Sequence, residues 1–505
     1  MIKSNIMANA FGRLWTFIST LIFIPLYIKF LGIELYGVVG FYSILLSVLS
    51  LADVGFTASV TREAARRNIR QASSASLGGL FRTYEVTYLV VSIFVGLFVW
   101  LLSPFIVDGF LQSSQDKSEE IILAIRLMGV AIAFQLPSSL YISGLMGLQR
   151  QVAANNLLIT WSLYRGLGGV LLLWLASPTI IVFAAWQLTS NILHFFTCRR
   201  ILRLELTGSS PIDDAAFDLR VLRETWRYGA SMAVMTIIST YLTQIDKLTV
   251  SKMLSLEQLG LYTIATSLAA APIMLASPIA LAVFPRLAEM VSVDDRERLI
   301  HLYRRASPLV SSVAIPAGLT IAFFSFDIIR LWTGSSEIAS RTSVATSLLV
   351  IGQTFQAITL IPFAVAQAYG LLKLNLQIGV FSIVAITPLL AYSTSNFGIN
   401  GAGFAWALIN SLTFPVYMYL LHARFIKEEF SRWLNYGVVL PFFCSLTSVT
   451  LGYLLASRSE SPFLRFLIAA TVFLGAIIAS AWISPDLRDE IKKLFTRLSN
   501  QAMKR

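Results

Sequence analysis

The chain has 505 residues, of which 56% are hydrophobic and only 13% are charged, and its formal net charge is +12. A soluble domain carries roughly 25% charged residues, so the composition excludes an ordinary soluble protein. Apolar runs of about 18 residues or more recur along the whole chain, and the ~10-residue alternating segments of a membrane β-barrel are absent. The sequence therefore predicts an all-α polytopic membrane protein.

The first apolar hairpin sets the pattern for the rest. Two apolar stretches flank the short turn LGIELYG at residues 31–37, and each can cross a hydrocarbon layer of ~30 Å as a helix. The N-terminal run is too long for a signal-peptide core, so we expect it to be retained. Fourteen such spans are predicted, at residues 9–29, 37–59, 80–103, 121–147, 156–175, 179–197, 227–250, 260–284, 306–326, 343–369, 374–392, 400–421, 433–456 and 462–483.

Lys and Arg residues are distributed unevenly between the two sides of these spans. An even number of spans places both termini on one side, and that side carries 29 of the 39 Lys and Arg residues, the opposite side six and the spans four. The positive-inside rule therefore predicts a multi-pass protein with both termini in the cytoplasm. Because the positive charge follows topology, it does not indicate nucleic-acid binding.

A short internal match suggests a repeat. A shift of 223 residues places Glu34 on Glu257 and Gly37 on Gly260, and six spans separate the two sites, so the hairpins share an orientation. We expect two parallel-repeat six-helix lobes, at 1–200 and 226–425, joined by a cytoplasmic linker at 201–225. An extra helix pair and a basic tail follow at 426–505. Facing repeats are a common transporter plan, with the substrate site between them.

Signatures of enzymes are missing from the sequence. There is no Walker A loop, no HExxH motif and no large polar loop that could house catalysis. Cys198 and Cys444 lie in or beside separate apolar segments, and we interpret them as small buried residues and not as a disulfide framework. The sequence predicts a protein that is not an enzyme and has no catalytic residue, cofactor or metal site.

Cations within the spans are the candidate substrate-binding residues. Charge at membrane depth costs ~2.5–3.5 kcal/mol on insertion scales, so such groups usually face a wet cavity or a partner. Arg165 lies near the middle of its span, where a structural ion pair with a buried carboxylate is the alternative. Arg126 and Lys247 lie in outer halves, where they could instead snorkel to the interface. Arg13 lies near the start of the first span, where an interfacial charge is an equal alternative. A guanidinium suits phosphate because its planar fork donates two hydrogen bonds.

Three carboxylates complete the set of candidate residues. Asp53, Glu85 and Asp246 could bind a proton or sodium ion and couple its gradient to transport. Alternatively, Asp53 and Glu85 serve as helix-end anchors or structural hydrogen-bond partners. Asp246 and Lys247 are adjacent and point about 100° apart on a helix, so at least one is expected to face an inter-helix cavity.

Two stretches resemble a known family. The opening hairpin, residues 9–66, and the segment QIDKLTVSKMLSLEQLGLYTIA at 244–265 resemble the Wzx-type polysaccharide flippases of the MATE-like MOP superfamily. The resemblance implies a V-shaped pair of six-helix lobes around a basic cavity. It also implies translocation of an undecaprenyl-pyrophosphate-linked oligosaccharide, such as an O-antigen unit, from the cytoplasmic to the periplasmic leaflet of the bacterial inner membrane by alternating access. Expected partners are the lipid-linked oligosaccharide, membrane lipids, a proton or sodium counter-ion, a polysaccharide polymerase and glycosyltransferases, with no nucleic acid.

Three other functions stay open at this point. A MATE-like cation or drug antiporter requires a cavity dominated by acids, whereas the charge at mid-depth here is basic. A peptidoglycan-precursor (lipid II) flippase shares the fourteen-span plan. A membrane glycosyl polymerase or ligase is disfavoured by the short outer loops.

Overall fold

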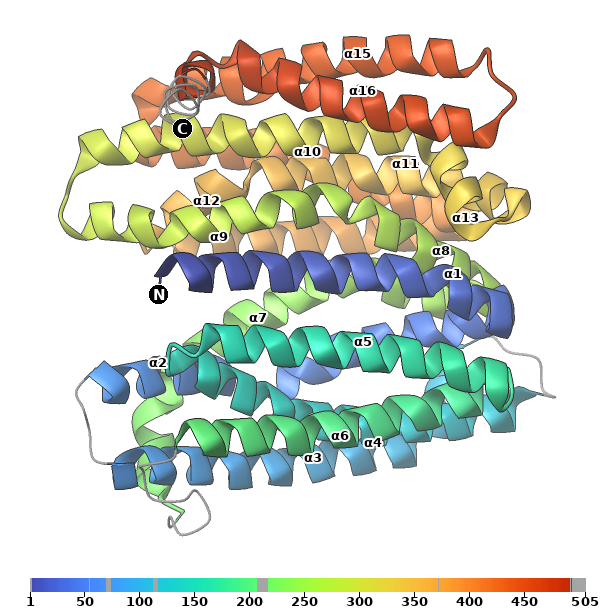
Figure 1. Cartoon of the computed structure of the whole chain (residues 1–505), viewed down its shortest axis with the longest axis vertical. Coiled ribbons are helices and arrows are strands. Elements are labelled where there is room, and N and C mark those ends of the chain that lie inside the picture. The colour runs from blue at the N-terminus through green and yellow to red at the C-terminus, as the bar shows by residue number, and fades with distance from the viewer. Residues whose placement is uncertain are drawn as a thin grey trace, which may run out of the picture. The chain divides into compact units, whose positions relative to one another are not determined.

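The structure is a computed structural model that describes residues 2–53, 55–69, 74–111, 117–206, 217–370, 372–490 and 492. The regular elements of these residues are all helices, joined by short turns, and none is a β-strand (Figure 1). Within the helices, the side chains of 2–11, 13, 67–69, 74–76, 224–232, 235 and 372–373 lie outside the description. Arg13 is among these, so its predicted role stays a prediction. The chain divides into two compact units, residues 1–260 and 261–505.

The first unit contains the helices that carry most of the candidate residues. In chain order they are α1 (Ile2–Leu49), the 3₁₀ turn η1 (Ser50–Asp53), α2 (Phe56–Ile69), α3 (Ser74–Phe110), α4 (Ser118–Gly147), α5 (Gln151–Leu175), α6 (Ile180–Glu205) and α7 (Leu219–Met253), followed by the first turn of α8 (Leu256–Ala269). Helix α4 packs between α3 and α6, and α5 packs against α1 and α6.

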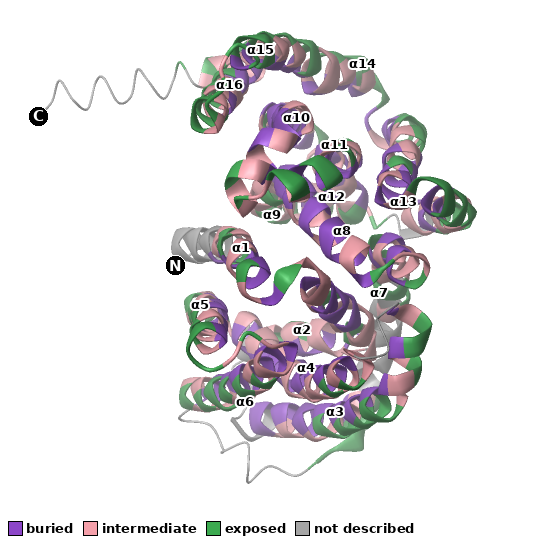
Figure 2. Ribbon diagram, turned by 90° about the vertical axis from the view of Figure 1, so that its right-hand side faces the viewer, coloured by how far each residue is buried: buried purple, intermediate pink, exposed green. Residues whose placement is uncertain are grey.

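The second unit is organised around one long helix. Its elements are the rest of α8, α9 (Ala271–Ser292), α10 (Arg296–Thr333), α11 (Ser336–Ile358), α12 (Leu360–Ala368), α13 (Leu372–Phe425), η4 (Lys427–Glu429), α14 (Phe430–Leu434), the π-helical turn η5 (Asn435–Val439), α15 (Leu440–Ala456) and α16 (Pro462–Ile483). Helix α10 contacts α9, α11, α15 and α16, and α11 packs on α13 (Figure 2).

The predicted spans coincide with this helical structure. In the described part, eleven helices are long and apolar enough to cross a membrane. Two of them, Leu14–Asp53 and Leu374–Phe425, each hold two predicted spans joined at a glycine with positive φ: Gly32 has φ 76° and Gly398 has φ 57°. L-residues with a Cβ rarely adopt such φ values, so glycine allows the helix to break there. Helix α7 carries a further predicted span, and the fourteen-span prediction is compatible with these helices.

The ends of several helices follow their local sequence. The side chains of Thr179, Asp218, Asp295 and Ser335 each accept a hydrogen bond from a backbone N–H in the first turn of the helix that they precede. Short polar side chains at this position satisfy amide groups that have no partner within the helix. Gly334, with φ 72°, ends α10.

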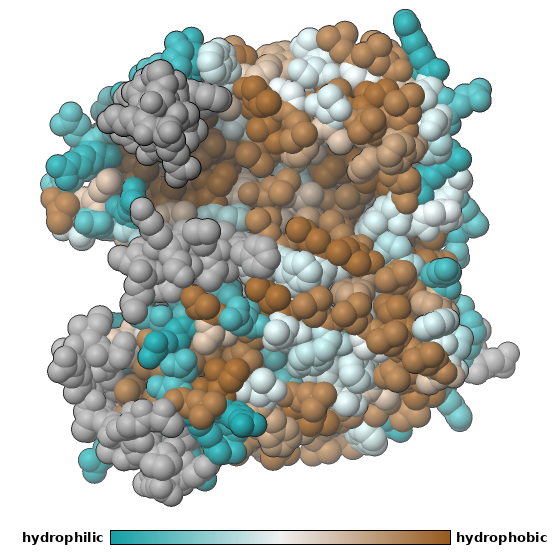
Figure 3. Space-filling view, viewed as in Figure 1, coloured by the Kyte–Doolittle hydropathy of each residue, from teal (hydrophilic) through white to brown (hydrophobic). Residues whose placement is uncertain are grey.

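Hydropathy of the surface agrees with a membrane-spanning fold. In each unit, the hydrophobic side chains lie mainly along the middle of the helices and the hydrophilic ones gather towards the helix ends (Figure 3). Large apolar side chains are well exposed, among them Ile93 at 69%, Phe94 at 68% and Phe105 at 74% on α3. Contiguous exposed apolar surface of this kind is expected where the solvent is lipid.

The two glycines of the predicted repeat make a reciprocal contact within the first unit. A Cβ on Gly37 would overlap the carbonyl oxygen of Leu256, and a Cβ on Gly260 would overlap the carbonyl oxygen of Ile33. The 223-residue shift maps Ile33 onto Leu256 as well as Gly37 onto Gly260. The second half of α1 and the first turn of α8 therefore pack backbone to backbone, and neither glycine position leaves room for a side chain.

We predict that Gly37→Ala destabilises the protein by about 1–3 kcal/mol, because the added methyl group overlaps backbone that cannot rotate away. Gly260→Ala should behave alike. The matched control is Gly79→Ala, since Gly79 is also helical and has nothing within 4 Å of its Cβ position. The measurement is the midpoint temperature for loss of the monodisperse peak in detergent. Equal midpoints for Gly37→Ala and Gly79→Ala would contradict the predicted packing.

Candidate functional site

Arg165 lies on α5, where a run of glycines brings neighbouring helices close. A Cβ on Gly166 would overlap the ring of Phe23 on α1, and one on Gly168 would overlap the ring of Trp186 on α6. The hydroxyl of Tyr27 donates to the carbonyl oxygen of Gly166 at 3.3 Å. The three glycines of the sequence GLGG, which have no side chain, thus let α1 and α6 pack closely against the turn of α5 that carries Arg165.

The guanidinium of Arg165 is half-buried among aromatic rings. Its Cζ lies 4.5 Å from the centre of the Trp161 ring, within cation–π range, and the Trp161 ring stacks on His194 with centroids 4.7 Å apart. The positive charge also acts on Tyr27, Tyr42, Tyr164 and His194, which come from α1, α5 and α6. Among the described residues, Arg165 has no acidic partner, so the alternative of a structural ion pair is not realised there.

Polar atoms near Arg165 have unused hydrogen-bonding capacity. We define the Arg165 cluster as Arg165, Trp161, Tyr164, Asn191, His194, Tyr27 and Tyr42. Gln187 lies one turn before Asn191 on α6. Asn191 Nδ2 donates to the Tyr42 hydroxyl at 3.4 Å, but the buried atoms Trp161 Nε1, Gln187 Oε1 and Asn191 Oδ1 have no partner among the described residues. Buried polar atoms are nearly always paired in folded proteins, so these groups suit water or a polar ligand.

Arg126 belongs to a different part of the first unit. Its Nε donates to Ser103 Oγ at 3.0 Å, and its Cζ lies 5.4 Å from the centre of the Trp100 ring. Both partners are on α3, so the contacts of Arg126 share no described residue with those of Arg165.

Asp246 and Lys247 differ in their surroundings on α7. Asp246 is buried, with 4% of its surface exposed, whereas Lys247 is half-buried and its Nζ donates to the carbonyl oxygen of Thr243 on the same helix at 3.3 Å. The expectation that at least one of the two faces an inter-helix cavity stays a prediction, since none of the pockets described here is lined by either residue.

Asp53 anchors the start of α2. Its carboxylate accepts from the Thr57 hydroxyl at 2.7 Å, from the Thr57 backbone N–H, and from the Tyr88 hydroxyl. A carboxylate at a helix N-terminus is also favoured by the helix dipole. The contacts therefore match the alternative in which Asp53 is a helix-end anchor.

Glu85 forms the centre of a buried ionic network. Its carboxylate accepts from Arg199 Nε at 2.6 Å, from Arg82 Nη1 at 3.2 Å and from the Tyr141 hydroxyl at 2.7 Å. These partners come from α3, α4 and α6, so the network joins three helices of the first unit. It matches the alternative in which Glu85 is a structural hydrogen-bond partner.

The second unit contains charged groups that the sequence prediction did not single out. Asp327 is buried and pairs with Arg465 at 3.1 Å, which links α10 to α16. Asp327 was missed because the predicted ninth span ended at residue 326. The intramembrane position of Arg465 was a usable signal, since a charge at that depth calls for a partner.

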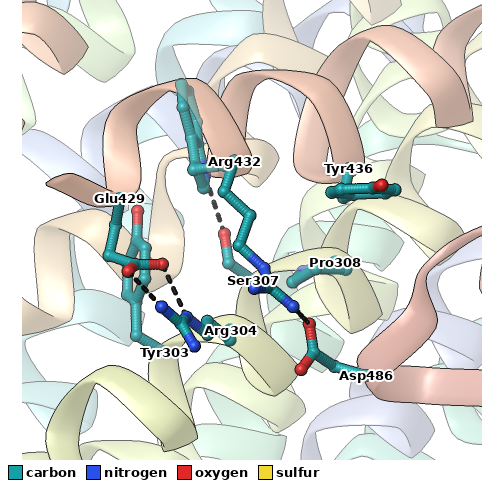
Figure 4. A pocket seen from close by; sticks show the side chains of 9 residues that line it. Tyr303, Arg304, Ser307, Pro308, Glu429, Arg432, Tyr436 and Asp486 are labelled. Carbon is teal, nitrogen blue, oxygen red and sulfur yellow. Dashed lines mark hydrogen bonds and ion pairs between the residues drawn. The ribbon is translucent and has the colours of Figure 1, made fainter. Parts of the chain in front are cut away.

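A polar pocket ties α10 to the C-terminal helices (Figure 4). Arg304 forms a two-point ion pair with Glu429, with N–O distances of 2.6 and 2.8 Å, and Arg432 pairs with Asp486 at 2.9 Å. The indole of Trp433 donates to Ser307 Oγ at 2.8 Å. Since its charged groups are paired with one another, we interpret these ion pairs as structural contacts between α10 and the C-terminal helices. Across the described chain, no three His, Cys, Asp or Glu side chains are grouped to hold a metal ion.

The fold defines the class of this chain, which is a polytopic helical membrane protein. The structure aligns with a lipid II flippase, MurJ, in an inward closed conformation, with a TM-score of 0.74 at 16% identity, covering 96% of this chain and 99% of the other. The profile of the family described as "Polysaccharide biosynthesis protein" matches residues 2–291, and the MatE profile matches 231–393. The chain belongs to the polysaccharide biosynthesis protein family.

Curated relatives are distant but span most of the chain. A Shigella flexneri protein named "Putative O-antigen transporter" is 23% identical over 81% of this chain and 94% of its own length. A Haloferax volcanii protein named "Probable flippase AglR" is 24% identical over 79% of this chain and 78% of its own.

We predict that Glu85→Gln lowers the free energy of unfolding by about 3 kcal/mol, because Arg199 and Arg82 then lose their anionic partner. The control is Glu337→Gln, whose exposed pair with Arg341 at 3.5 Å should contribute at most about 1 kcal/mol. Both variants are compared by thermal unfolding in detergent. A Glu85→Gln midpoint as high as that of the control would show that the network is dispensable.

Proposed function

We propose that this protein is a flippase that carries an undecaprenyl-pyrophosphate-linked oligosaccharide, such as an O-antigen repeat unit, from the cytoplasmic to the periplasmic leaflet by alternating access. The observation that carries the proposal is Arg165. It is a half-buried guanidinium within the helices of the first unit and has no acidic partner among the described residues. Membership of the polysaccharide biosynthesis family and the names of the relatives support the substrate class.

The physical argument starts from the cost of that charge. Burying a cation without an anionic partner at membrane depth costs free energy, so such a residue is expected to have a function. A pyrophosphate supplies the missing anion, and the guanidinium fork binds it through two parallel hydrogen bonds. Trp161 offers an unsatisfied indole N–H, and Gln187 and Asn191 offer unsatisfied amide oxygens that suit the hydroxyl groups of sugars.

The other candidate residues have separate proposed roles. Arg13 and Lys247 are proposed as further cations of the substrate path. Asp246 is the proposed site of coupling to a proton or sodium gradient. The hydrogen bonds of Asp53 to Thr57 and of Glu85 to Arg199 support a structural role for those two carboxylates. Arg126, at the outer end of α3 and α4, shares no described contact with Arg165 and is left out of the proposed headgroup path.

Two other functions of the same fold are alternatives. The MatE profile over 231–393 favours a cation or drug antiporter, and the structural likeness to MurJ favours a lipid II flippase. The half-buried cation in the Arg165 cluster argues against a cationic cargo. Lipid II also carries a pyrophosphate, so only the transported glycan separates it from the proposed substrate.

We place the protein in the bacterial inner membrane with both termini in the cytoplasm. The 29-to-6 division of Lys and Arg between the two sides supports this orientation. The glycosyltransferases that build the lipid-linked unit and the polymerase that consumes it are the proposed functional partners.

Arg165→Ala is expected to abolish polysaccharide export in a flippase-null strain while the protein accumulates normally in the membrane. Lipid-linked oligosaccharide should build up in the cytoplasmic leaflet. Arg165→Lys should restore export only in part, because an ammonium cannot make the two-point contact. Export is measured as surface polysaccharide per cell.

The matched control is Arg458→Gln, which removes an exposed arginine on the outer side and should leave export unchanged. Full export by Arg165→Ala would reject the central role of this cation. Restored growth after depletion of the lipid II flippase, without polysaccharide export, would move the assignment to peptidoglycan precursors.

The orientation is tested with single cysteines on a background in which the half-buried Cys444 is replaced by Ser. Ser457→Cys, at the exposed end of α15, should react with a membrane-impermeant maleimide in intact spheroplasts. Ser292→Cys, at the exposed end of α9, should react only after permeabilisation. The reverse labelling pattern would invert the proposed topology.

A further inference from the structure

An apolar groove runs along the outer surface of the first unit between α3 and α4. It has a volume of about 440 Å³ and is lined by Leu89, Ser92, Ile93, Gly96, Leu97, Trp100, Val130, Ala133, Phe134 and Pro137. Gly96 and Ala133 form its floor, where a Cβ on Gly96 would lie 3.2 Å from that of Ala133. On the other side of Leu97, α3 exposes further apolar residues, including Phe94 and Phe98, so this face meets lipid (Figure 2).

The groove has the length of one leaflet. From Leu89 to Trp100 is eleven residues of helix, or about 16 Å, and half of a typical hydrocarbon layer is ~15 Å. The predicted span 80–103 has its middle near residues 91–92, which places Leu89 close to the midplane and Trp100 about 13 Å outward. In the span 121–147, Arg126 lies about 12 Å outward from the middle, at the same depth as Trp100.

Arg126 provides a cation at the outer end of this groove. Its guanidinium lies over the ring of Trp100, which lines the groove, and uses Nε to hold Ser103. Its two terminal nitrogens have no hydrogen-bond partner in the described part of the chain, and no acidic side chain there pairs with it. The nearest acidic residues along α3 and α4 are Asp108, Glu119 and Glu120, which lie about two turns further towards the outer aqueous phase.

We propose that this groove and Arg126 form a binding site for an anionic phospholipid of the outer leaflet. One acyl chain lies in the groove from Trp100 to Leu89, and the phosphate binds the terminal nitrogens of Arg126. The occupant is a bilayer lipid and not the transported lipid, because an undecaprenyl chain is far longer than a groove that ends at the midplane. The site goes beyond the proposed flippase activity and does not depend on it.

Fluorescence quenching of Trp100 tests the site in the full-length protein reconstituted in phosphatidylcholine vesicles. Part of the lipid is replaced by phosphatidylglycerol or phosphatidylcholine carrying dibrominated acyl chains. The fluorescence of Trp100 is obtained by subtracting the fluorescence of the Trp100→Phe variant from that of the wild-type protein. One basic residue near the membrane surface favours an anionic lipid by about fivefold, so brominated phosphatidylglycerol should half-quench Trp100 at about one-fifth of the mole fraction.

Three variants separate the two parts of the site. Arg126→Gln should remove the preference for phosphatidylglycerol and leave quenching by brominated phosphatidylcholine unchanged. Arg126→Lys should keep most of the preference for phosphatidylglycerol. Ala133→Phe, which fills the groove, should reduce quenching by both lipids. Arg458→Gln is the control for loss of an outer cation and should behave as wild type.

Equal quenching of wild-type Trp100 by the two brominated lipids would overturn the proposal, as would a preference that survives Arg126→Gln. Displacement of the brominated lipid by undecaprenyl phosphate, but not by unlabelled phosphatidylglycerol at the same mole fraction, would also overturn it and assign the groove to the transported lipid. Should Ala133→Phe fail to fold, the comparison of Arg126→Gln with Arg126→Lys still tests whether the preference for phosphatidylglycerol depends on the charge at residue 126.

Discussion

A charge inside a hydrocarbon layer must be paired, hydrated or bound to a ligand, and this constraint explains where the charged residues of the protein lie. Glu85 meets two arginines and a tyrosine, and Asp327 meets Arg465. The Glu85–Arg199 and Asp327–Arg465 pairs each join helices that are distant in sequence. Arg165 and Arg126 instead rest on aromatic rings without an acidic partner among the described residues. The same rule that makes the paired groups structural makes these two cations the natural places for an external anion.

Helix identity and the family could be read from the sequence because both depend on local patterns. Apolar runs located the spans, and the turn glycine Gly32 fell inside the predicted first turn. The surroundings of the charged residues were harder to predict from the sequence. Sequence reasoning left Glu85 open between ion coupling and structure, since its partner Arg199 is 114 residues away on α6. Asp327 was missed because a boundary drawn one residue short placed it outside the membrane.

The Arg165 cluster shows the same limit at the candidate site. The depth of Arg165 and its following glycines were visible in the sequence. Tyr27, Trp161, Asn191 and His194 were not predicted as its neighbours, because their proximity depends on how α1, α5 and α6 pack. The spacing of Gln187 and Asn191, one turn apart on α6, is a signal that becomes meaningful only once α6 is known to face α5.

The contact between Gly37 and Gly260 has a consequence for genetic suppression. Each glycine abuts a backbone carbonyl oxygen, of Leu256 or Ile33, and not only a side chain. Shortening a neighbouring side chain therefore cannot recreate the lost space. Revertants of a bulky substitution at either position should be confined to restoration of the glycine itself or to changes that displace a whole helix.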